Sequence, residues 1–513
     1  MKKLPIGIQT FSKIRQDNYA YVDKTPFIRK LLDSGEYYFI SRPRRFGKSL
    51  FVDTLKEAFE ANRDLFKGLY LENNWDWGKK HPVIRISFGG GTVGSRQELD
   101  MRICGILKTC NEALGMKSLQ DNDIPTFFAN LIRKSSQAFG QKTVILVDEY
   151  DKPILDNITD TNTAVEIREG LKSLYSVIKD NDAHIRFAFL TGVSKFSKVS
   201  LFSGLNNLTD ITIDEPYSAL CGYTQADLET VFAEHLEGLD MDVLRRWYNG
   251  YSWAGENVYN PFGMLQVLRS RQIRNYWFET ATPSFLIKLL QKRRYDIPRL
   301  ESLEVGEEVA LSFDVEQITP EALLFQTGYL TIDHIETVAA ERVYHLKYPN
   351  IEVQSSLNSH ILNNYLEDPA SKTLFQKGIY KALDRGDPEL IHTTFKSLFA
   401  SIPHDWYRKN NMDAYEGYYA SVFYSYFASL GLEMKAEDAT SKGNIDLMVR
   451  QGRNVYLFEF KMADSPAPAA LDQIKEKHYH EKYRSPDTDL FLIGIVFSKA
   501  ERNIIGFSWE KAT

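Results

Sequence analysis

The sequence predicts an α/β protein in three parts, and three observations support this fold class. Over roughly the first two hundred residues, short apolar runs alternate with helical patterns, which favours a mostly parallel sheet covered on both faces. From about residue 206, short helical segments rich in aromatic residues replace this alternation. From about residue 402, a helix, three strand-like runs, a second helix and a last strand follow in that order. We therefore expect a parallel α/β domain, a mainly helical middle domain and an αβββαβ domain.

The length and composition agree with several globular domains. A chain of 513 residues is too long for one ordinary core, and its 28 Tyr and 31 Phe exclude a disordered chain. We place the domains at residues 1–205, 206–345 and 402–513, with a helical connector at 346–401. The formal net charge of −6 excludes a general attraction to nucleic acid, so any such binding requires a local basic surface.

The cysteines and the apolar runs limit the cellular setting. Three cysteines without paired spacing predict neither a disulfide framework nor a zinc site: Cys104, Cys110 and Cys221. No apolar run follows the two lysines at the N-terminus, and the longest apolar runs, such as 490–497, have only the length of a strand. We expect a soluble cytoplasmic protein with no membrane partner.

The expected elements of the N-terminal domain follow from periodicity. The apolar runs predict strands at 37–41, 83–87, 143–148 and 185–191. Helical spacing predicts helices directly after residue 48 and near 97–118, 121–138 and 164–180. The middle domain lacks this rhythm, and a winged-helix-like arrangement is one expectation for it.

The tripeptide Gly47-Lys48-Ser49 lies where the first strand enters a helix. A phosphate-binding loop needs inward backbone N–H groups, a helix N-terminus, a lysine for the β- and γ-phosphates and a hydroxyl for magnesium. The usual loop has a glycine five positions before Gly47, where this chain has Arg42. Alone, the tripeptide is a weak signal.

The strand TVILVD strengthens the nucleotide hypothesis because it ends in Asp148 and Glu149. A buried strand delivers such carboxylates to the carboxyl edge of a parallel sheet. There, Asp148 would hold the magnesium ion, and Glu149 would orient and deprotonate the attacking water. Together the two motifs predict ATP binding, with Phe46 as a further residue of the loop at the nucleotide.

Other polar residues near this edge have two interpretations. Thr191 or Ser194, at the tip of the strand 185–191, would sense the γ-phosphate, or would belong to an ordinary turn. The loop arginines would contact phosphate or a neighbouring subunit, or would form structural salt bridges: Arg42, Arg44 and Arg45. Whether the protein forms a homo-oligomer therefore stays an open question.

A second group of charged residues lies in the C-terminal domain. Asp446 lies in one predicted strand, and Glu459 and Lys461 lie two positions apart in the next, so they share one face of that strand. The short segment between Asp446 and Glu459 leaves room for a tight hairpin. Carboxylates that gather a hard cation beside a basic group suit phosphodiester cleavage. A charged strand edge is the alternative.

Several long strings of the chain resemble the bacterial AAA-ATPase-like family. They are RPRRFGKSL, LVDEYDKP, LTGVSKFSKVSLFSGLNNLTDIT, RWYNGYSW, VYNPFGML and FQTGYLTI. Loops of this family tend to read RPRRFGKS, so Arg42 follows the family pattern. The resemblance implies an ASCE-type P-loop NTPase with an additional strand, closer to signalling ATPases than to processive motors. It also implies a C-terminal nuclease domain of the PD-(D/E)XK, restriction-endonuclease-like kind.

Within that signature, Asp446 is similar to the first acid, Glu459 to the second and Lys461 to the lysine. The resemblance implies that Glu416 is a further metal ligand and that Gln473 lies near the site. Asn444 stands where relatives often have arginine, which puts affinity or substrate in doubt more than chemistry. The implied cofactors are ATP and Mg²⁺, with Mn²⁺ as a substitute at the nuclease site, and the implied substrate is DNA or RNA.

Two further patterns have competing interpretations. The aromatic stripe at 415–427 favours core packing over base stacking. The basic residues of the next helical segment would meet a phosphate backbone or form a solvated face: Lys475, Lys477, His478, His480, Lys482 and Arg484.

Three functional hypotheses remain. The first is an ATPase that controls a nuclease, the second a nucleotide-dependent switch whose C-terminal domain binds without cutting, and the third an ATPase regulator that never meets nucleic acid.

Overall fold

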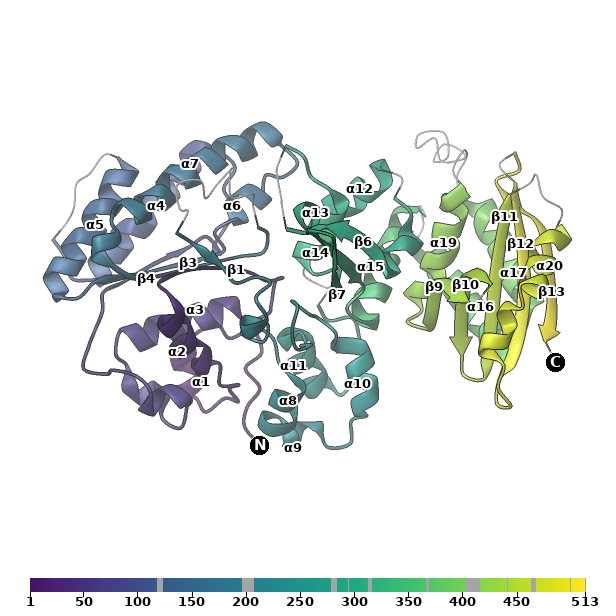
Figure 1. The fold of residues 1–513 in the computed structure, drawn as a ribbon, viewed down its shortest axis with the longest axis horizontal. Helices are drawn as coiled ribbons and strands as arrows, with labels where there is room; N and C mark the ends of the chain where they lie inside the picture. The colour runs from purple at the N-terminus through teal and green to yellow at the C-terminus, as the bar shows by residue number, and fades with distance from the viewer. Residues whose placement is uncertain are drawn as a thin grey trace. The chain divides into compact units, whose positions relative to one another are not determined.

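The computed structural model describes residues 1–117, 123–195, 207–277, 284–293, 295–311, 316–365, 369–402, 416–440, 442–462, 467–498 and 500–512. The chain divides into two compact units. The first comprises residues 1–277 and 304–345, and the second comprises 278–303 and 346–513 (Figure 1). Residues 278–303 thus group with the C-terminal unit although they precede 304–345 in the chain. The four domain limits expected from the sequence stay a prediction.

The first unit is built on a parallel sheet. Its strands are β1 (Tyr37–Ser41), β2 (Val83–Ser87), β3 (Thr143–Asp148), β4 (Ile185–Gly192) and β5 (Thr209–Asp210). The strand order is β2-β3-β4-β1-β5, and each neighbouring pair is parallel. β4 therefore lies between β1 and β3, which is the additional strand that the resemblance implied. The parallel arrangement brings the carboxyl ends of β1, β3 and β4 to one edge.

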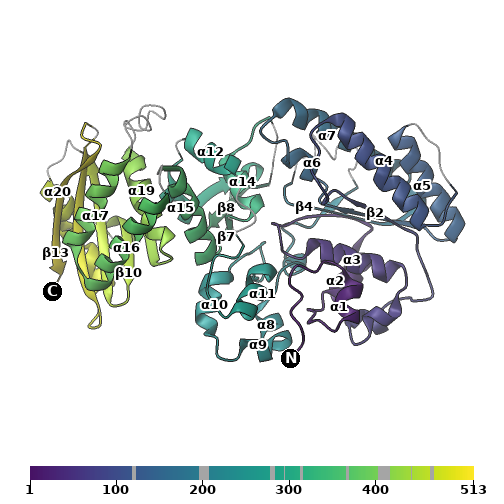
Figure 2. The same ribbon diagram turned by 180° about the vertical axis from the view of Figure 1, so that it is seen from behind.

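Helices cover both faces of this sheet, as the alternating pattern predicted (Figures 1 and 2). On one face lie α1 (Phe11–Gln16), α2 (Thr25–Ser34) and α3 (Lys48–Phe59). On the other lie α4 (Arg96–Ala113), α5 (Ile124–Phe139) and α7 (Thr161–Asp180), and the short α6 (Lys152–Leu155) packs on α7. The sequence did not predict α1 and α2.

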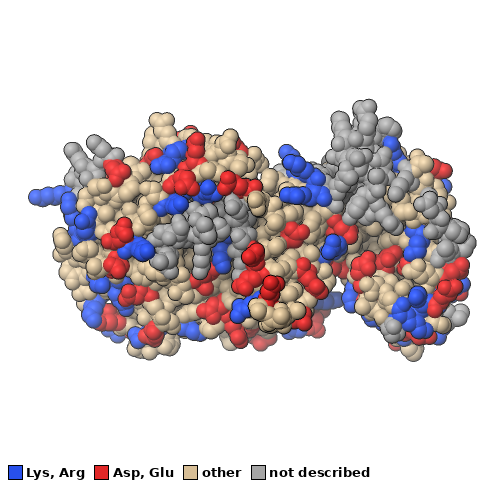
Figure 3. Space-filling model, turned by 45° about the horizontal axis from the view of Figure 1, so that its top comes forward, with Lys and Arg blue, Asp and Glu red and all other residues tan. Residues whose placement is uncertain are grey.

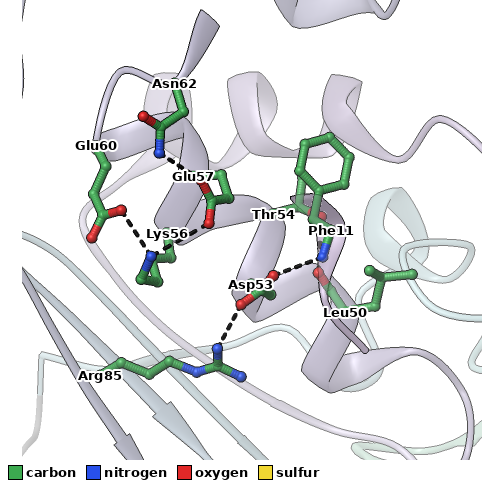
Figure 4. A network of polar contacts seen from close by, with 9 residues as sticks. All are labelled: Phe11, Leu50, Asp53, Thr54, Lys56, Glu57, Glu60, Asn62 and Arg85. Carbon is green, nitrogen blue, oxygen red and sulfur yellow. Dashed lines mark hydrogen bonds and ion pairs between the residues drawn. The ribbon is translucent and has the colours of Figure 1, made fainter. Parts of the chain in front are cut away.

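A buried carboxylate fixes α3, the helix that follows the Gly47-Lys48-Ser49 loop. Asp53 on α3 accepts hydrogen bonds from the backbone N–H of Phe11 at 2.7 Å and from Arg85 Nη1 at 2.6 Å (Figure 4). Because Phe11 begins α1 and Arg85 lies in β2, one side chain joins three elements. Asp53 is only 5% exposed, so losing either partner would leave a buried polar group unsatisfied.

The middle region is mainly helical, as predicted. Its helices are α8 (Gln225–Val231), α9 (Ala233–Leu236), α10 (Met241–Tyr248), α11 (Pro261–Ser270), α13 (Glu307–Leu311) and α14 (Pro320–Thr327). A small sheet of order β6-β8-β7 was not expected: β6 (Leu303–Gly306), β7 (Thr331–Val338) and β8 (Glu341–Lys347). The winged-helix-like arrangement stays a prediction.

The second unit begins with helices. They are α12 (Ser284–Lys292), the 3-10 helix η6 (Ile297–Glu301), α15 (Ile351–Tyr365), α16 (Pro369–Arg385) and α17 (Pro388–Ser401). The predicted αβββαβ order follows as α19 (Glu416–Ser429), β9 (Glu433–Thr440), β10 (Gly443–Gln451), β11 (Asn454–Met462), α20 (Ala467–Glu476) and β12 (Asp489–Ser498). The 3-10 helix η7 (Tyr479–Tyr483) continues the helical region, and β13 (Asn503–Ala512) is an additional strand.

The C-terminal sheet has the order β13-β12-β11-β10-β9. β11 and β12 are parallel, and the other neighbouring pairs are antiparallel. On one face, aromatic side chains of α17 and α19 pack on the strands: Phe395, Phe423 and Phe427 contact one another, and Phe423 also contacts Phe458. The aromatic residues between Tyr419 and Phe427 are therefore all part of the core, as the core interpretation of the stripe predicted. Residues 415–418 of that stripe lie outside the described side chains.

Hydropathy adds one negative observation. Within the part of the chain that the structure describes, no helix is both long enough and apolar enough to cross a membrane.

Candidate functional site

The loop between β1 and α3 has the backbone geometry of an anion-binding turn. Gly47, the N-cap residue of α3, has φ 93°, and Arg45 has φ 70°, so both are left-handed. A side chain at Gly47 would meet no atom within 4 Å, so the space beside this backbone is open. Left-handed residues in such a loop turn successive N–H groups toward one point, and the N-terminus of α3 adds a favourable dipole for an anion.

Lys48 lies inside the curve of this loop. Its Nζ donates to the carbonyl oxygens of Arg42 at 2.7 Å and Pro43 at 2.8 Å. The side chain is 6% exposed, and burial lowers the pKa of the ammonium group. The loop thus holds a lysine whose partners are carbonyl dipoles, and phosphate oxygens would be stronger acceptors for the same group. Ser49 follows it, half-buried, in the first turn of α3.

The predicted carboxylates lie at the carboxyl end of β3. Asp148 is 3% exposed, and its Oδ1 accepts a hydrogen bond from Thr191 Oγ1 at 2.8 Å. Glu149 follows with φ 56°, a conformation that is rare for glutamate and redirects the chain after the strand. Burial raises the pKa of Glu149, the charge of Asp148 adds to that rise, and Lys48 opposes it. These charges therefore interact at one edge of the sheet.

Asp151 belongs to this edge, although the sequence did not single it out. Its buried carboxylate accepts hydrogen bonds from the backbone N–H of Val193 at 3.0 Å, and from the N–H and Oγ of Ser194 at 2.6 and 2.7 Å. Burial raises its pKa. Asp151 thereby joins the turn after β3 to the turn after β4. In the sequence, Asp151 could have been noticed as the second aspartate of the string DEYD.

Ser194 and Thr191 consequently have different surroundings. The Ser194 hydroxyl is bound to Asp151, whereas Thr191 is bound to the carboxylate expected to hold magnesium. A γ-phosphate-sensing role for either residue stays a prediction, and the position of Thr191 beside Asp148 suits that role better.

Arg42 has its partners within the protein. Its Nη1 donates to the carbonyls of Ser41 at 2.9 Å and Thr212 at 2.7 Å, and the guanidinium lies 4.2 Å from the centre of the Trp253 ring. Arg42 is 1% exposed, and burial lowers its pKa to about 10. Through these contacts Arg42 joins the start of the loop to the segment around Thr212 and to Trp253, which favours a structural role.

The other loop residues also differ in their surroundings. The guanidinium of Arg45 lies 3.7 Å from the centre of the Phe262 ring, and the buried Phe46 packs edge to face against Tyr251. Arg44 is exposed, and its charge lowers the pKa of Glu149. Contact of these three residues with a nucleotide stays a prediction, which the geometry favours most for Arg44.

In the second unit, the β10–β11 hairpin brings the predicted acids together. Leu447 pairs with Phe458 across the hairpin, so Asp446 and Glu459 lie next to each other at its open end. Asp446 Oδ2 accepts a hydrogen bond from the backbone N–H of Phe460 at 2.7 Å, and Lys461 Nζ lies 2.9 Å from Glu459 Oε1. The predicted tight hairpin thus has the required register.

Gln473 reaches this group from α20. Its Nε2 donates to Glu459 Oε1, the oxygen that also accepts from Lys461. α20 approaches closely because β12 has Gly494 beneath it: a Cβ atom there would lie 2.5 Å from the backbone nitrogen of Leu471. A larger residue at position 494 would push α20, and Gln473 with it, away from Glu459.

The negative charges of Asp446 and Glu459 are only partly neutralised by Lys461. Glu459 is 1% exposed, and its buried Oε2 has no hydrogen-bond partner among the described residues. Burial, reinforced by the charge of Glu459, raises the pKa of Asp446 to about 7, and burial also raises that of Glu459. A buried and a half-buried carboxylate beside one lysine form a group that a divalent cation would stabilise.

A cavity of about 240 Å³ opens beside Asp446. Lys461 lines it, together with two acids that the sequence analysis did not select, Asp296 and Glu437. Glu437 has φ 47° in β9, and its charge raises the pKa values of both Asp446 and Glu459. The local signal for Glu437 was weak, because an exposed strand is often rich in glutamate.

The donor set fits a divalent cation in its chemistry. Asp446 and Glu459 supply hard oxygen ligands, and the partnerless Glu459 oxygen is the observation that favours a cation there. Within the described side chains, however, no three His, Cys, Asp or Glu residues gather closely enough to form a full ligand set. Glu416 begins α19, but its side chain lies outside those described, so its role as a third ligand stays a prediction.

Several of the basic residues noted in the sequence are paired with acids. Lys475 contacts Glu510, and Lys482 Nζ lies 2.6 Å from the buried Asp438. On the face of the molecule shown in Figure 3, basic and acidic side chains are interspersed. These observations favour the solvated-face interpretation, although Lys461 remains a basic residue at the cavity.

A parallel sheet with β4 between β1 and β3, a loop around Lys48 and paired carboxylates after β3 define a P-loop NTPase-like unit. The β10–β11 acids and Lys461 on an αβββαβ scaffold define a nuclease-like unit. The chain belongs to the predicted AAA-ATPase family, and its C-terminal region belongs to the PD-(D/E)XK nuclease superfamily. The family described as "Predicted AAA-ATPase" matches residues 5–202, and "PD-(D/E)XK nuclease superfamily" matches residues 414–507.

A curated relative is similar to this chain over almost its whole length. The "Uncharacterized protein in vnfD 5'region" of Azotobacter chroococcum mcd 1 is 54% identical over 511 residues, which covers 99% of each chain. Among solved structures, that of the Aeropyrum pernix ORC1 protein in complex with DNA covers 69% of this chain and 98% of that chain, with 11% identity and a TM-score of 0.28. A score this low is below that of a shared overall fold.

Proposed function

We propose that the first unit binds and hydrolyses ATP with Mg²⁺, and that its nucleotide state controls a Mg²⁺-dependent nuclease site in the second unit. The observation that carries the proposal is the pair of neighbouring acids, the half-buried Asp446 and the buried Glu459, beside Lys461, with one glutamate oxygen that has no partner among the described residues. The substrate class is DNA or RNA, because the phosphodiester backbone is what such a site cleaves.

At the nucleotide edge, each residue has a role that its position supports. Lys48 would exchange its two carbonyl partners for the β- and γ-phosphates. Ser49 and Asp148 would hold Mg²⁺, with Thr191 orienting Asp148. Glu149, whose pKa burial raises, would accept the proton of the attacking water.

At the C-terminal site, Asp446 and Glu459 would hold the cation, and the Glu459 oxygen without a partner would be the first ligand. Bound there, Mg²⁺ or Mn²⁺ would polarise the scissile phosphate and lower the pKa of a ligated water. Lys461 would assist the water, and Gln473 would hold Glu459 in place through its amide. Glu416 is the proposed further ligand.

A second function is favoured by two specific observations. No third ligand joins Asp446 and Glu459 among the described side chains, and the basic residues of α20 and η7 include acid-paired ones. The first observation suits a nucleotide-dependent switch whose C-terminal domain binds nucleic acid or a protein without cleaving it, and the second favours the protein partner. A nuclease assay separates the two functions.

The test uses the purified full-length chain with labelled single- and double-stranded DNA and RNA. Each substrate is incubated with Mg²⁺ or Mn²⁺, in the presence of ATP, ADP or a non-hydrolysable ATP analogue. We expect cation-dependent cleavage of one substrate class, with a rate that changes with the nucleotide and is lost in Glu459→Ala. Retained binding without cleavage of any substrate would establish the switch instead. Cleavage that is identical with every nucleotide would contradict the control by ATP.

A further inference from the structure

The cavity beside Asp446 has a wall that comes from far away in the sequence. Asp296 and Pro298 line it, and they lie in or next to η6, well before the matched nuclease region of 414–507. Residues 278–303 fold with the second unit, while residues on either side of them belong to the first. The C-terminal site is therefore not built from the C-terminal domain alone.

Glu301, the last residue of η6, anchors this segment. Its Oε2 accepts the backbone N–H of Ala436 in β9 at 2.6 Å. Its Oε1 accepts Tyr424 Oη–H of α19 at 2.8 Å and Gln354 Nε2 of α15 at 3.0 Å. One carboxylate thus joins η6, α15, α19 and β9, and the partner in β9 is 135 residues away in sequence.

The position of Ala436 gives this anchor its functional meaning. Glu437, the next residue, has φ 47° and lines the cavity. The strand pairing skips that position: Ala436 pairs with Leu447 and Asp438 with Ile445, so Glu437 lies at an irregularity opposite Asp446. Such a conformation persists only when the surrounding contacts enforce it. The bond from Glu301 to Ala436 holds the strand immediately before that irregularity.

Burial would normally disfavour a carboxylate at position 301. It raises the pKa of Glu301 to about 7, while the three donors act in the opposite direction. A neutral apolar side chain would avoid this cost but could not accept the three hydrogen bonds. Three donors from three elements require an acceptor with several lone pairs, which a carboxylate provides.

We infer that Glu301 is a positioning residue of the C-terminal site, which holds β9 so that Glu437 and the Asp296 segment shape the cavity beside Asp446. The inference rests on the proposed function, because it adds a residue to the same site.

The experiment measures Mn²⁺ binding to the full-length chain by calorimetry, without any nucleic acid. Asp446→Asn identifies the heat that belongs to the C-terminal site. We expect Glu301→Ala to weaken this binding roughly tenfold or more, the usual scale for losing a residue that orients metal ligands. Glu301→Gln keeps one oxygen for Ala436 and should recover most of the affinity. Amide exchange of the peptide that spans β9 should become faster in the alanine variant only.

A matched control removes a structural bond elsewhere in the same unit. Asp387 caps α17 by accepting the backbone N–H of Leu390 at 3.0 Å, so Asp387→Ala should lower stability without changing Mn²⁺ affinity. If Glu301→Ala does not fold, Tyr424→Phe replaces it, since that change removes one donor to Glu301 and keeps the ring. A smaller loss of affinity in Tyr424→Phe supports the inference.

Two outcomes would overturn the inference, and they lead to different conclusions. Wild-type affinity in Glu301→Ala, or in Tyr424→Phe if that variant is used, with binding still lost in Asp446→Asn, would overturn the positioning role alone. Absence of any Asp446-dependent Mn²⁺ binding in the wild-type chain would overturn the inference together with the proposed nuclease site.

Discussion

At the nucleotide edge of the first unit, several charged residues have partners within the protein, whereas the two acids of the C-terminal site share one lysine, and one oxygen of Glu459 has no partner among the described residues. Lys48 has two carbonyl acceptors, Asp148 has Thr191 and Asp151 has Ser194. Burial and the charges of Glu459 and Glu437 raise the pKa of Asp446 to about 7. The first site is therefore assembled before its ligand arrives, while the second has an electrostatic deficit that a cation would remove.

This contrast predicts that substitutions have different consequences at the two sites. At the nucleotide edge, a variant should lose a ligand contact while the fold persists. At the C-terminal site, removing Asp446 or Glu459 should stabilise the protein without metal, because it relieves repulsion between carboxylates, and should also remove the response to metal.

The largest effect is expected for Glu459→Ala. This change removes the buried ligand whose Oε2 has no described partner, so nuclease activity and stabilisation by Mn²⁺ should both be abolished. A nuclease assay and a thermal-shift titration with Mn²⁺ measure the two effects, and ATP hydrolysis should continue at the wild-type rate. Asp446→Asn should behave similarly because a neutral amide oxygen holds the cation more weakly, and Lys461→Ala should keep the cation but cut poorly. Stabilisation by Mn²⁺ that persists in Glu459→Ala would place the cation elsewhere.

The next effect is loss of ATP binding in Lys48→Ala. The lysine supplies charge-assisted hydrogen bonds to phosphate that no neighbouring group replaces. Calorimetry with ATP should show no binding, while the circular dichroism spectrum stays that of the wild type. Lys56→Ala is a suitable control, because Lys56 lies on the same helix and pairs with Glu60 at 2.8 Å. Equal ATP affinity in Lys48→Ala and wild type would refute the assignment of the loop.

A smaller effect is expected for Glu149→Gln. The amide keeps the size and hydrogen bonding of the side chain but cannot take a proton, so ATP should still bind while turnover falls roughly a hundredfold or more. Steady-state hydrolysis and ATP calorimetry on the same preparation separate the two quantities. An unchanged turnover would mean that another group, with Asp151 the nearest candidate, accepts the proton.

Local patterns were sufficient to predict the elements that carry both sites. The strands Tyr37–Ser41, Val83–Ser87 and Thr143–Asp148 have the bounds expected from their apolar runs. A buried parallel strand must be apolar on both faces, so its sequence signal is strong. The charged residues at the ends of such runs were visible for the same reason, since they interrupt an apolar pattern where a parallel sheet presents its ligands.

Contacts between distant segments were not predictable from these patterns. Nothing in the periodicity around Glu301 indicates that it reaches Ala436, 135 residues away. The half-exposed β13 and the β7–β8 hairpin were missed because their alternation is weak and much of each strand is polar. The surroundings of Arg42 and Ser194 were likewise hidden, because periodicity does not show that Arg42 reaches Thr212 or that Ser194 binds Asp151.

The smallest effect concerns how stability depends on pH, and it tests Glu301 without reference to metal or ATP. Burial raises the pKa of this carboxyl to about 7 in the folded chain, above its ordinary value near 4.5. Between these two pH values the folded state binds a proton that the unfolded state has released, so stability falls as pH rises through this range. Glu301→Gln has no proton to lose, so its stability should decline less between pH 5 and pH 8, by on the order of 2 kcal/mol or less. Urea denaturation of both proteins at several pH values measures the difference, with the exposed Glu501→Gln as control. Parallel curves for Glu301→Gln and wild type would mean that the three donors, Ala436, Tyr424 and Gln354, keep this carboxylate ionised throughout, so that its hydrogen bonds outweigh the cost of burial.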